Sequence, residues 1–173
     1  MPTTASSRLN DVDLEAVGGL VRAIQADPAK ARTTWAAHVT WQGGFASEAR
    51  VRTFEPARSD EPAGLGGGDT APNPVEQLLG ALGNCLAVGY AANASVAGIA
   101  LDDLRIDLEG DVDLHVFLGL GEGHAGFDTI EATVTIDSPA PRADLEALHA
   151  KVLASSPVGH TLRSPVPVEV TLA

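Results

Sequence analysis

One long apolar segment, residues 73–96, constrains the fold of this chain more than any other feature. Asn73 is a good N-cap, Pro74 suits the first helical position, and Glu76 stands where its carboxylate can reach back in a capping box. The residues that follow are apolar on nearly every side. This pattern predicts a buried central helix.

Glycine interrupts this predicted helix at Gly80, Gly83 and Gly89. Each glycine weakens a helix by about 1 kcal/mol relative to alanine. Their presence therefore predicts that another helix packs very closely, with a second subunit as one source. The apolar run 78–92 is also too short for a membrane span, which needs about 20 residues.

The composition is that of one globular domain, with 173 residues, 45% of them hydrophobic and 20% charged. A formal net charge of −12 disfavours nucleic acids and anionic membrane surfaces as partners. The N-terminus has neither a basic start nor an apolar core of a signal peptide, so we expect a cytoplasmic protein. A single cysteine, Cys85, excludes an intramolecular disulfide.

The remaining pattern predicts an α+β fold in which antiparallel hairpins surround the long helix. Residues 1–10 are predicted to be disordered, and residues 11–26 to form an amphipathic helix. Pro141 is predicted to open another helix, and Ser156-Pro157 to cap a short helical turn. The predicted strands are residues 35–42, 48–52, 104–116, 130–136 and 166–172, the last at a sheet edge because of its prolines.

Two glycine-rich segments fail the tests for cofactor sites. Residues 121–126 match G-x-G-x-x-G but run into a strand rather than a helix, so we interpret them as a turn. Residues 66–68 lack the lysine and hydroxyl residue of a phosphate loop. The histidines form no close ligand pair, so the sequence predicts neither a cofactor nor a metal.

Cys85 lies midway along the predicted central helix, among Ala81, Leu82 and Gly89. An apolar setting far from the helix N-terminus keeps a thiol protonated unless a cation approaches. From these neighbours alone, an inert core cysteine is the favoured interpretation.

The run 73–87, including Asn73, Pro74 and Cys85, resembles the central helix of the OsmC/Ohr family of bacterial stress proteins. Residues 155–162 resemble the segment that carries the second cysteine of the family, and residues 41–44 resemble its N-terminal hairpin. The resemblance covers residues 33–173 and leaves residues 1–32 as an N-terminal extension with an amphipathic helix. It implies an intertwined homodimer with two sites at the subunit interface.

In the peroxidases of that family, a helix cysteine attacks an organic hydroperoxide and a second cysteine resolves the sulfenic acid. An arginine paired with a glutamate keeps the first thiol ionised. Cys85 matches the attacking cysteine, but Ser156 occupies the resolving position and Val75 the position of the glutamate. The activating arginine has no counterpart in register, although three arginines are near, at positions 50, 52 and 58. His160 is a weak substitute.

Three hypotheses follow. The first is a one-cysteine peroxidase, in which Cys85 reduces an organic hydroperoxide and an external thiol regenerates it. The second is a non-catalytic dimer that binds a small apolar ligand in an interface pocket formed by Leu78, Leu82 and Trp41. The third, hydrolysis by Ser156 with His160, lacks any sign of an oxyanion hole or an orienting acid.

Overall fold

The computed structural model describes residues 8–173. The chain divides into two compact units. The first unit comprises the residues up to Leu14 together with residues 79–173, and the second comprises residues 15–78. The long helix α2, Pro74–Ala97, begins in the second unit and contributes most of its length to the first.

The start of α2 is fixed by the predicted capping box. The backbone N–H of Asn73 donates to Glu76 Oε2 at 2.8 Å, and the N–H of Glu76 donates to Asn73 Oδ1 at 2.9 Å. These reciprocal bonds satisfy two amide groups that would otherwise lack an intrahelical partner. The predicted helix is therefore confirmed, and so is the role assigned to Glu76.

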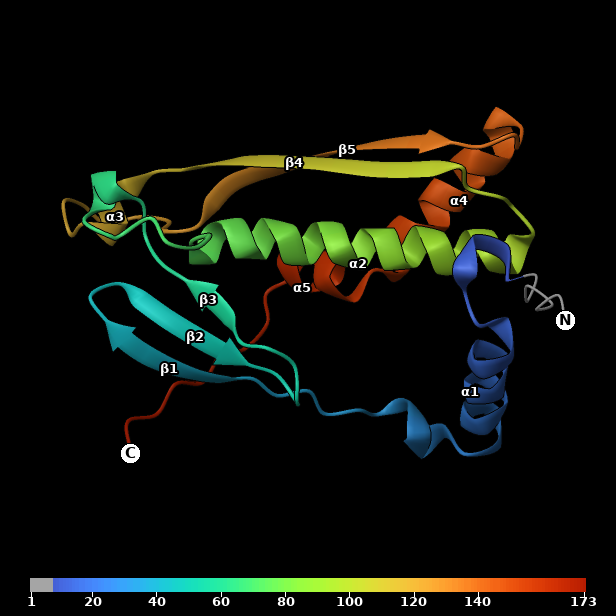
Figure 1. The fold of residues 1–173 in the computed structure, drawn as a ribbon, viewed down its shortest axis with the longest axis horizontal. Helices are drawn as coiled ribbons and strands as arrows, with labels where there is room; N and C mark the ends of the chain where they lie inside the picture. The colour runs from blue at the N-terminus through green and yellow to red at the C-terminus, as the bar shows by residue number, and fades with distance from the viewer. Residues whose placement is uncertain (1–7) are drawn as a thin grey trace, which may run out of the picture. The chain divides into compact units, whose positions relative to one another are not determined.

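A long antiparallel hairpin, β4 (Asp103–Val112) and β5 (Phe127–Asp137), runs alongside α2 in the first unit (Figure 1). Alternate side chains of β4 are half-buried, as expected for a strand with one covered face. The hairpin side chains that pack against the core of this unit are Leu104 and Ile106 from β4 and Val134 and Ile136 from β5.

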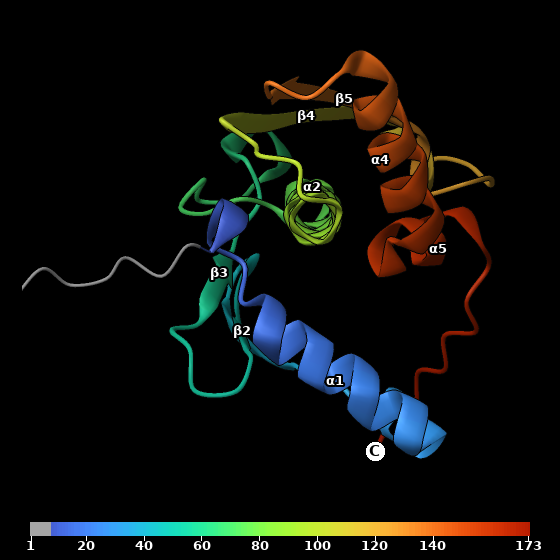
Figure 2. The ribbon, with the colours of Figure 1, turned by 90° about the vertical axis from the view of Figure 1, so that its right-hand side faces the viewer.

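The helices α4 (Arg142–Ser155) and α5 (Pro157–Arg163) cover a different side of α2 from the hairpin (Figure 2). Their contact with α2 forms the buried core, which consists of Leu86, Tyr90 and Ala94 from α2 and Leu148 and Val152 from α4. As predicted, Pro141 precedes the start of α4, and α5 begins at Pro157 with Ser156 as its N-cap.

The three glycines of α2 have different surroundings. A Cβ at Gly89 would lie 3.0 Å from Val152, so the predicted close helix exists, but it comes from the same chain. A Cβ at Gly83 would lie 2.8 Å from Leu108, which belongs to a strand. Gly80 faces open space in the single chain. The prediction of a second-subunit helix therefore remains untested at Gly80.

The N-terminal segment is ordered earlier than predicted. Residues Leu9–Asp11 form a 3-10 turn before α1 (Leu14–Ala26), and residues 1–7 lie outside the described part of the chain. The Asn10 side chain donates to Ser95 Oγ at 3.1 Å and to the Ile99 carbonyl at 2.9 Å. It also accepts the Leu101 N–H at 2.9 Å. The prediction of disorder was wrong for Asn10 because these partners lie more than 80 residues away in sequence.

The second unit contains a three-stranded antiparallel sheet of β1 (His38–Gly43), β2 (Ala46–Arg50) and β3 (Ala57–Ser59). The predicted hairpin is confirmed, with Val39 opposite Ala49. Sequence analysis missed β3 because its three residues are too few to show an alternating pattern. A short turn, Pro28–Ala31, precedes the sheet, and another, Ala63–Leu65, follows it.

Two predicted strands differ from the structure. The strand predicted to reach residue 116 ends at Val112, because Asp113 caps the short helix α3 (Leu114–Phe117). Residues 166–172 form no strand, since the described residues offer them no neighbouring strand, and Val170 is 90% exposed. No helix in the described part of the chain is long and apolar enough to cross a membrane.

Candidate functional site

The α2–α5 contact brings together the two residues that matched the cysteine positions of the family. Cys85 Sγ lies 3.3 Å from Ser156 Oγ, within hydrogen-bond distance for sulfur. The serine is only 4% exposed, whereas the cysteine is half-buried and remains partly accessible. The pair therefore joins a buried hydroxyl residue to a cysteine that is only half-buried.

The position of the Ser156 hydroxyl is set by its role as the N-cap of α5. Its Oγ accepts the backbone N–H of Gly159 at 3.1 Å. This bond uses an oxygen lone pair and leaves the hydroxyl hydrogen free to point at Cys85. A side chain at Gly159 would interfere, because a Cβ there would lie 3.0 Å from Ser156 Oγ.

Three contacts at successive turns fix the register between α4 and α2. His149 Nδ1 hydrogen-bonds the hydroxyl of Tyr90, which is fully buried. One turn later Val152 packs on Gly89, and one turn beyond that Ser156 meets Cys85. Burial raises the pKa of Tyr90, so its phenol stays protonated at neutral pH.

Arg163, at the end of α5, is a cation that bonds backbone carbonyls on both sides of Ser156. It donates from Nη2 to the Leu153 carbonyl at 2.8 Å and from Nε to the Gly159 carbonyl at 3.1 Å. These bonds hold the end of α4 against α5. Among the described residues, the only hydrogen-bond partner of Cys85 Sγ is Ser156.

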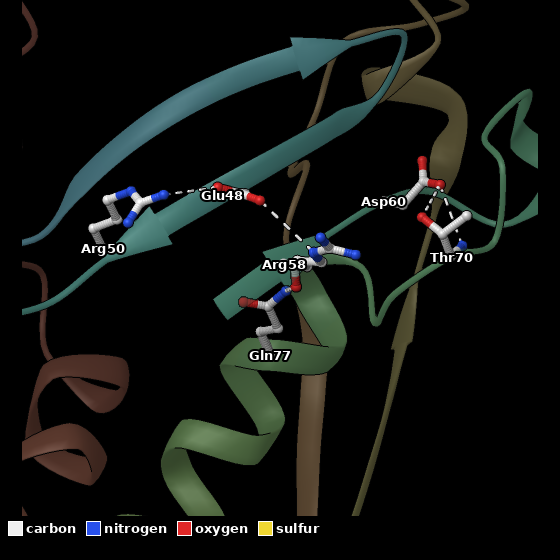
Figure 3. Close-up of polar contacts among 6 residues, drawn as sticks. All are labelled: Glu48, Arg50, Arg58, Asp60, Thr70 and Gln77. Carbon is white, nitrogen blue, oxygen red and sulfur yellow. Dashed lines mark hydrogen bonds and ion pairs between the residues drawn. The ribbon is translucent and has the colours of Figure 1, made fainter. Parts of the chain in front are cut away.

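The three arginines that the sequence placed near the site, at positions 50, 52 and 58, have partners within the second unit. Figure 3 shows Glu48 between Arg50 and Arg58, with N–O distances of 3.3 Å and 3.7 Å. Arg52 lies over the ring of Phe54, with its guanidinium carbon 4.5 Å from the ring centroid. The Gln77 side chain donates to the Arg58 carbonyl at 2.9 Å and so ties the start of α2 to β3.

The glycine-rich loop before α2 is organised by the buried Asp60, whose bonds to Thr70 are drawn in Figure 3. Its Oδ2 accepts the Thr70 hydroxyl at 2.8 Å and the backbone N–H of Gly68 at 3.1 Å. The Thr70 hydroxyl bond is the main reason that the pKa of Asp60 is lowered, and the backbone N–H groups of residues 61, 68 and 70 add to it. All of these groups belong to the loop itself, so the loop has a defined structural role.

Among the described residues, the side chains of the other predicted site residues form no hydrogen bond with the Cys85 or Ser156 side chain. His160 forms a hydrogen bond from Nε2 to the Ala154 carbonyl at 3.0 Å, and no bond links its ring to Ser156 among the described residues. Leu82 packs against the core. Leu78 belongs to the second unit, as does Trp41, whose indole N–H donates to the Gly44 carbonyl at 2.9 Å.

Sequence reasoning missed two features near the pair. The Gly159 amide could have been found, because the N-cap prediction for Ser156 already implies an N–H donor three residues later. The Tyr90–His149 bond left no signal, since 59 residues separate its partners. Within residues 8–173, no group of three or more histidine, cysteine or acidic side chains could hold a metal ion.

Comparison with solved structures identifies the same fold in several bacterial proteins. An OsmC-like protein from Mycoplasma pneumoniae superposes with a TM-score of 0.65 at 17% identity, covering 76% of this chain and 88% of that one. An organic hydroperoxide resistance protein OsmC from Legionella pneumophila gives a TM-score of 0.56 at 19% identity, with 76% and 92% covered. An organic hydroperoxide resistance protein from Elizabethkingia anophelis gives 0.56 at 17%, with 76% and 91% covered.

These TM-scores show a shared fold of antiparallel sheets and a long helix, and at such low sequence identities they show the fold alone. No curated protein matches the sequence. The profile of the OsmC-like protein family, however, matches residues 66–171, which is more than half of the chain and includes both Cys85 and Ser156. On this evidence the chain belongs to the OsmC-like protein family.

Proposed function

We propose that this protein is a one-cysteine, thiol-dependent reductase of organic hydroperoxides, with Cys85 as the reacting group. The observation that carries the proposal is the 3.3 Å contact between Cys85 Sγ and a Ser156 hydroxyl that is already oriented by the Gly159 amide. A hydroxyl donor aimed at sulfur stabilises negative charge there. Two solved structures of the same fold are described as organic hydroperoxide resistance proteins, which supports this substrate class.

The proposed reaction begins with attack of the Cys85 thiolate on the terminal oxygen of the hydroperoxide. The O–O bond breaks, the alkoxide takes up a proton and leaves as an alcohol, and the sulfur becomes a sulfenic acid. An external thiol then attacks that sulfur, releasing water and forming a mixed disulfide. A second thiol restores Cys85 and leaves as the external disulfide.

The external thiol is required because Ser156 cannot form a disulfide. A single hydroperoxide consumes two thiols and yields one alcohol, one water and one disulfide. We propose the cytoplasm as the location, since low-molecular-weight thiols are kept reduced there.

The direct test measures oxidation of Cys85. We expect cumene hydroperoxide at neutral pH to add one oxygen to the intact mass, and dimedone to trap the product on the peptide containing residue 85. Cys85→Ala should show neither change. Absence of both changes in the wild-type protein would exclude the peroxidase and favour the non-catalytic, ligand-binding alternative.

A second test uses the short distance between the two side chains. We expect Ser156→Cys to form a disulfide with Cys85 after one equivalent of hydroperoxide, seen as a loss of two hydrogens in the intact mass. Ser155→Cys is the matched control, because the adjacent Ser155 bonds the Lys151 carbonyl and is exposed. Equal disulfide yields in the two variants would contradict the proposed geometry.

We also propose that the protein functions as a homodimer. Part of α2 is open in the single chain, since a Cβ added at Gly80 would meet nothing within 4 Å and Val88 is 70% exposed. The apolar side chains of residues 166–172 are exposed as well. A second copy would cover both features, and a small-residue helix face suits close helix packing.

Val88→Lys tests the dimer, because lysine is a good helix former but its charge opposes burial. We expect the wild-type protein to sediment as a dimer and this variant as a monomer. Ala150→Lys places the same charge at an exposed position of α4 and should leave the dimer intact. A monomeric wild-type protein would exclude the proposal.

A further inference from the structure

A pocket of about 240 Å³ lies between β5 and α4 in the first unit, away from the Cys85–Ser156 pair. Its apolar lining consists of Val134 and Ile136 from the strand and Leu145 from the helix. Its polar lining consists of Arg142, Glu146 and His149, all from α4. The pocket is smaller than a drug-sized site, so it suits a molecule with a short carbon chain.

The buried Tyr90 hydroxyl determines which nitrogen of His149 carries the hydrogen. A phenol is protonated at neutral pH, and the only partner of this hydroxyl among the described residues is His149 Nδ1. We assign Tyr90 as the donor and Nδ1 as the acceptor, because a buried phenol hydrogen needs a partner. In that arrangement the distal N–H is on Nε2, which has no partner in the described part of the chain. His149 lines the pocket and its ring is held by the buried Tyr90, so its Nε2–H is the donor that we assign to a ligand there.

Arg142 supplies a positive charge to the same pocket. Its Nε donates to Glu146 Oε1 at 2.8 Å, which uses one of the five guanidinium N–H groups. The Arg142 side chain is largely exposed, so its terminal N–H groups can turn toward a ligand. One cation, one neutral donor and one nearby carboxylate favour a ligand with a single negative charge over a dianion.

We propose that this pocket binds a small monocarboxylate with a short, branched aliphatic chain. The carboxylate accepts hydrogen bonds from His149 Nε2 and the Arg142 guanidinium, while the chain packs against Val134, Ile136 and Leu145. Charge-assisted bonds to a carboxylate are stronger than those to a neutral oxygen. The apolar walls select against inorganic phosphate. This site is separate from the proposed chemistry of Cys85 and does not depend on it.

The test is a titration of the full-length protein with 3-methylbutanoate, followed by ¹H–¹⁵N NMR spectra. We expect saturable shifts at residues of β5 and α4 around the pocket, with a dissociation constant in the millimolar range typical of so small a ligand. The neutral isostere 3-methylbutan-1-ol should bind at least about tenfold more weakly, because it lacks the charge.

Two variants assign the donors. Arg142→Gln removes the cation, and His149→Asn keeps an acceptor for Tyr90 but removes the distal N–H. Each should weaken binding of 3-methylbutanoate by about fivefold or more. Lys151→Gln is the matched control, since it removes a cation of α4 that does not line this pocket and should leave affinity unchanged.

Several results would overturn the proposal. These are an absence of saturable shifts, shifts confined to other parts of the molecule, equal affinity for the alcohol, or unchanged affinity in Arg142→Gln with the folded spectrum intact. None of these readouts involves oxidation of Cys85, so the outcome is independent of whether the protein reduces hydroperoxides.

Discussion

The two compact units differ in what holds them together. In the first unit, five apolar side chains from α2 and α4 are buried in one cluster. In the second unit, the buried side chains among the described residues are polar ones, Asp60 and Asn73, and both are hydrogen-bonded. The first unit is stabilised by an apolar core, whereas the second depends on strand pairing and capped loops.

This contrast indicates that the second unit cannot be stable by itself. A small sheet needs an apolar face packed against something else, and β1 exposes Val39 and Trp41 instead. The chain thus exposes apolar side chains on this sheet although its net charge is strongly acidic. In a homodimer such a sheet would obtain its missing apolar cover from the protein itself.

The largest expected effect tests the core of the first unit. Leu148→Ala should lower the free energy of unfolding by about 2–5 kcal/mol, because it removes a buried side chain and leaves a cavity. Val39→Ala, in the second unit, should cost less than about 0.5 kcal/mol if that sheet is as open as in the single chain. Urea denaturation measures the free energy of unfolding of both variants, and equal losses would show that another surface covers β1.

The next effect concerns the loop that stabilises the second unit. A Cβ at Gly67 would lie 1.9 Å from the Glu61 carbonyl oxygen, so Gly67→Ala should force the loop open and cost about 1–3 kcal/mol. Gly64→Ala is the control, because a Cβ there meets nothing within 4 Å. Thermal unfolding of both variants gives the comparison, and similar melting temperatures would contradict the predicted clash at Gly67.

The two units should also respond to pH in opposite directions. The pKa of Asp60 is lowered below its ordinary value of 3.8, so its contribution is present above that value and is lost as pH falls through the folded value. The pKa of Tyr90 is raised above 10.0, so its contribution is present below pH 10 and is lost as pH rises through the folded value.

Both shifts can be measured. Asp60→Asn should flatten the acid limb of stability against pH and leave the alkaline limb unchanged. Tyr90 is the only tyrosine of the chain, so its absorbance near 295 nm reports its ionisation alone. We expect the folded protein to titrate above the unfolded one, and coincident curves would contradict the burial of Tyr90.

The smallest expected effects are those of the surface ion pairs. Arg50→Gln in the second unit and Arg142→Gln in the first should each change stability by no more than about 1 kcal/mol, since exposed pairs contribute little. Chemical denaturation at low and high salt checks this. A much larger loss in Arg50→Gln would mean that the Glu48 pairs, rather than a missing cover, distinguish the second unit.

Local signals allowed much of the fold to be predicted from the sequence. The capping box at Asn73 and the Ser156-Pro157 start of α5 lie within a few residues, and both are confirmed. The α+β class follows from periodicity alone. The Cys85–Ser156 pairing needed the family resemblance, because 71 residues separate the two and no short-range pattern connects them.

Features that depend on distant partners could not be predicted in this way. Asn10 was expected to be disordered, yet its amide group bonds Ser95 at the end of α2 and Leu101 in the segment that follows. Residues 166–172 have the alternation of a strand, but a strand also needs a neighbour, which the sequence pattern does not supply. The β5–α4 pocket likewise needs residues of a strand and of a helix that only the folded chain brings together.

The one-turn spacing of His149, Val152 and Ser156 makes the sulfur–oxygen distance at Cys85 a property of helix register. Ser156 directly follows the last residue of α4, so a shift of α4 along α2 would disturb the tyrosine bond and the serine contact together. A search for variants with altered thiol reactivity should therefore include position 152, whose side chain packs on Gly89 between these two contacts.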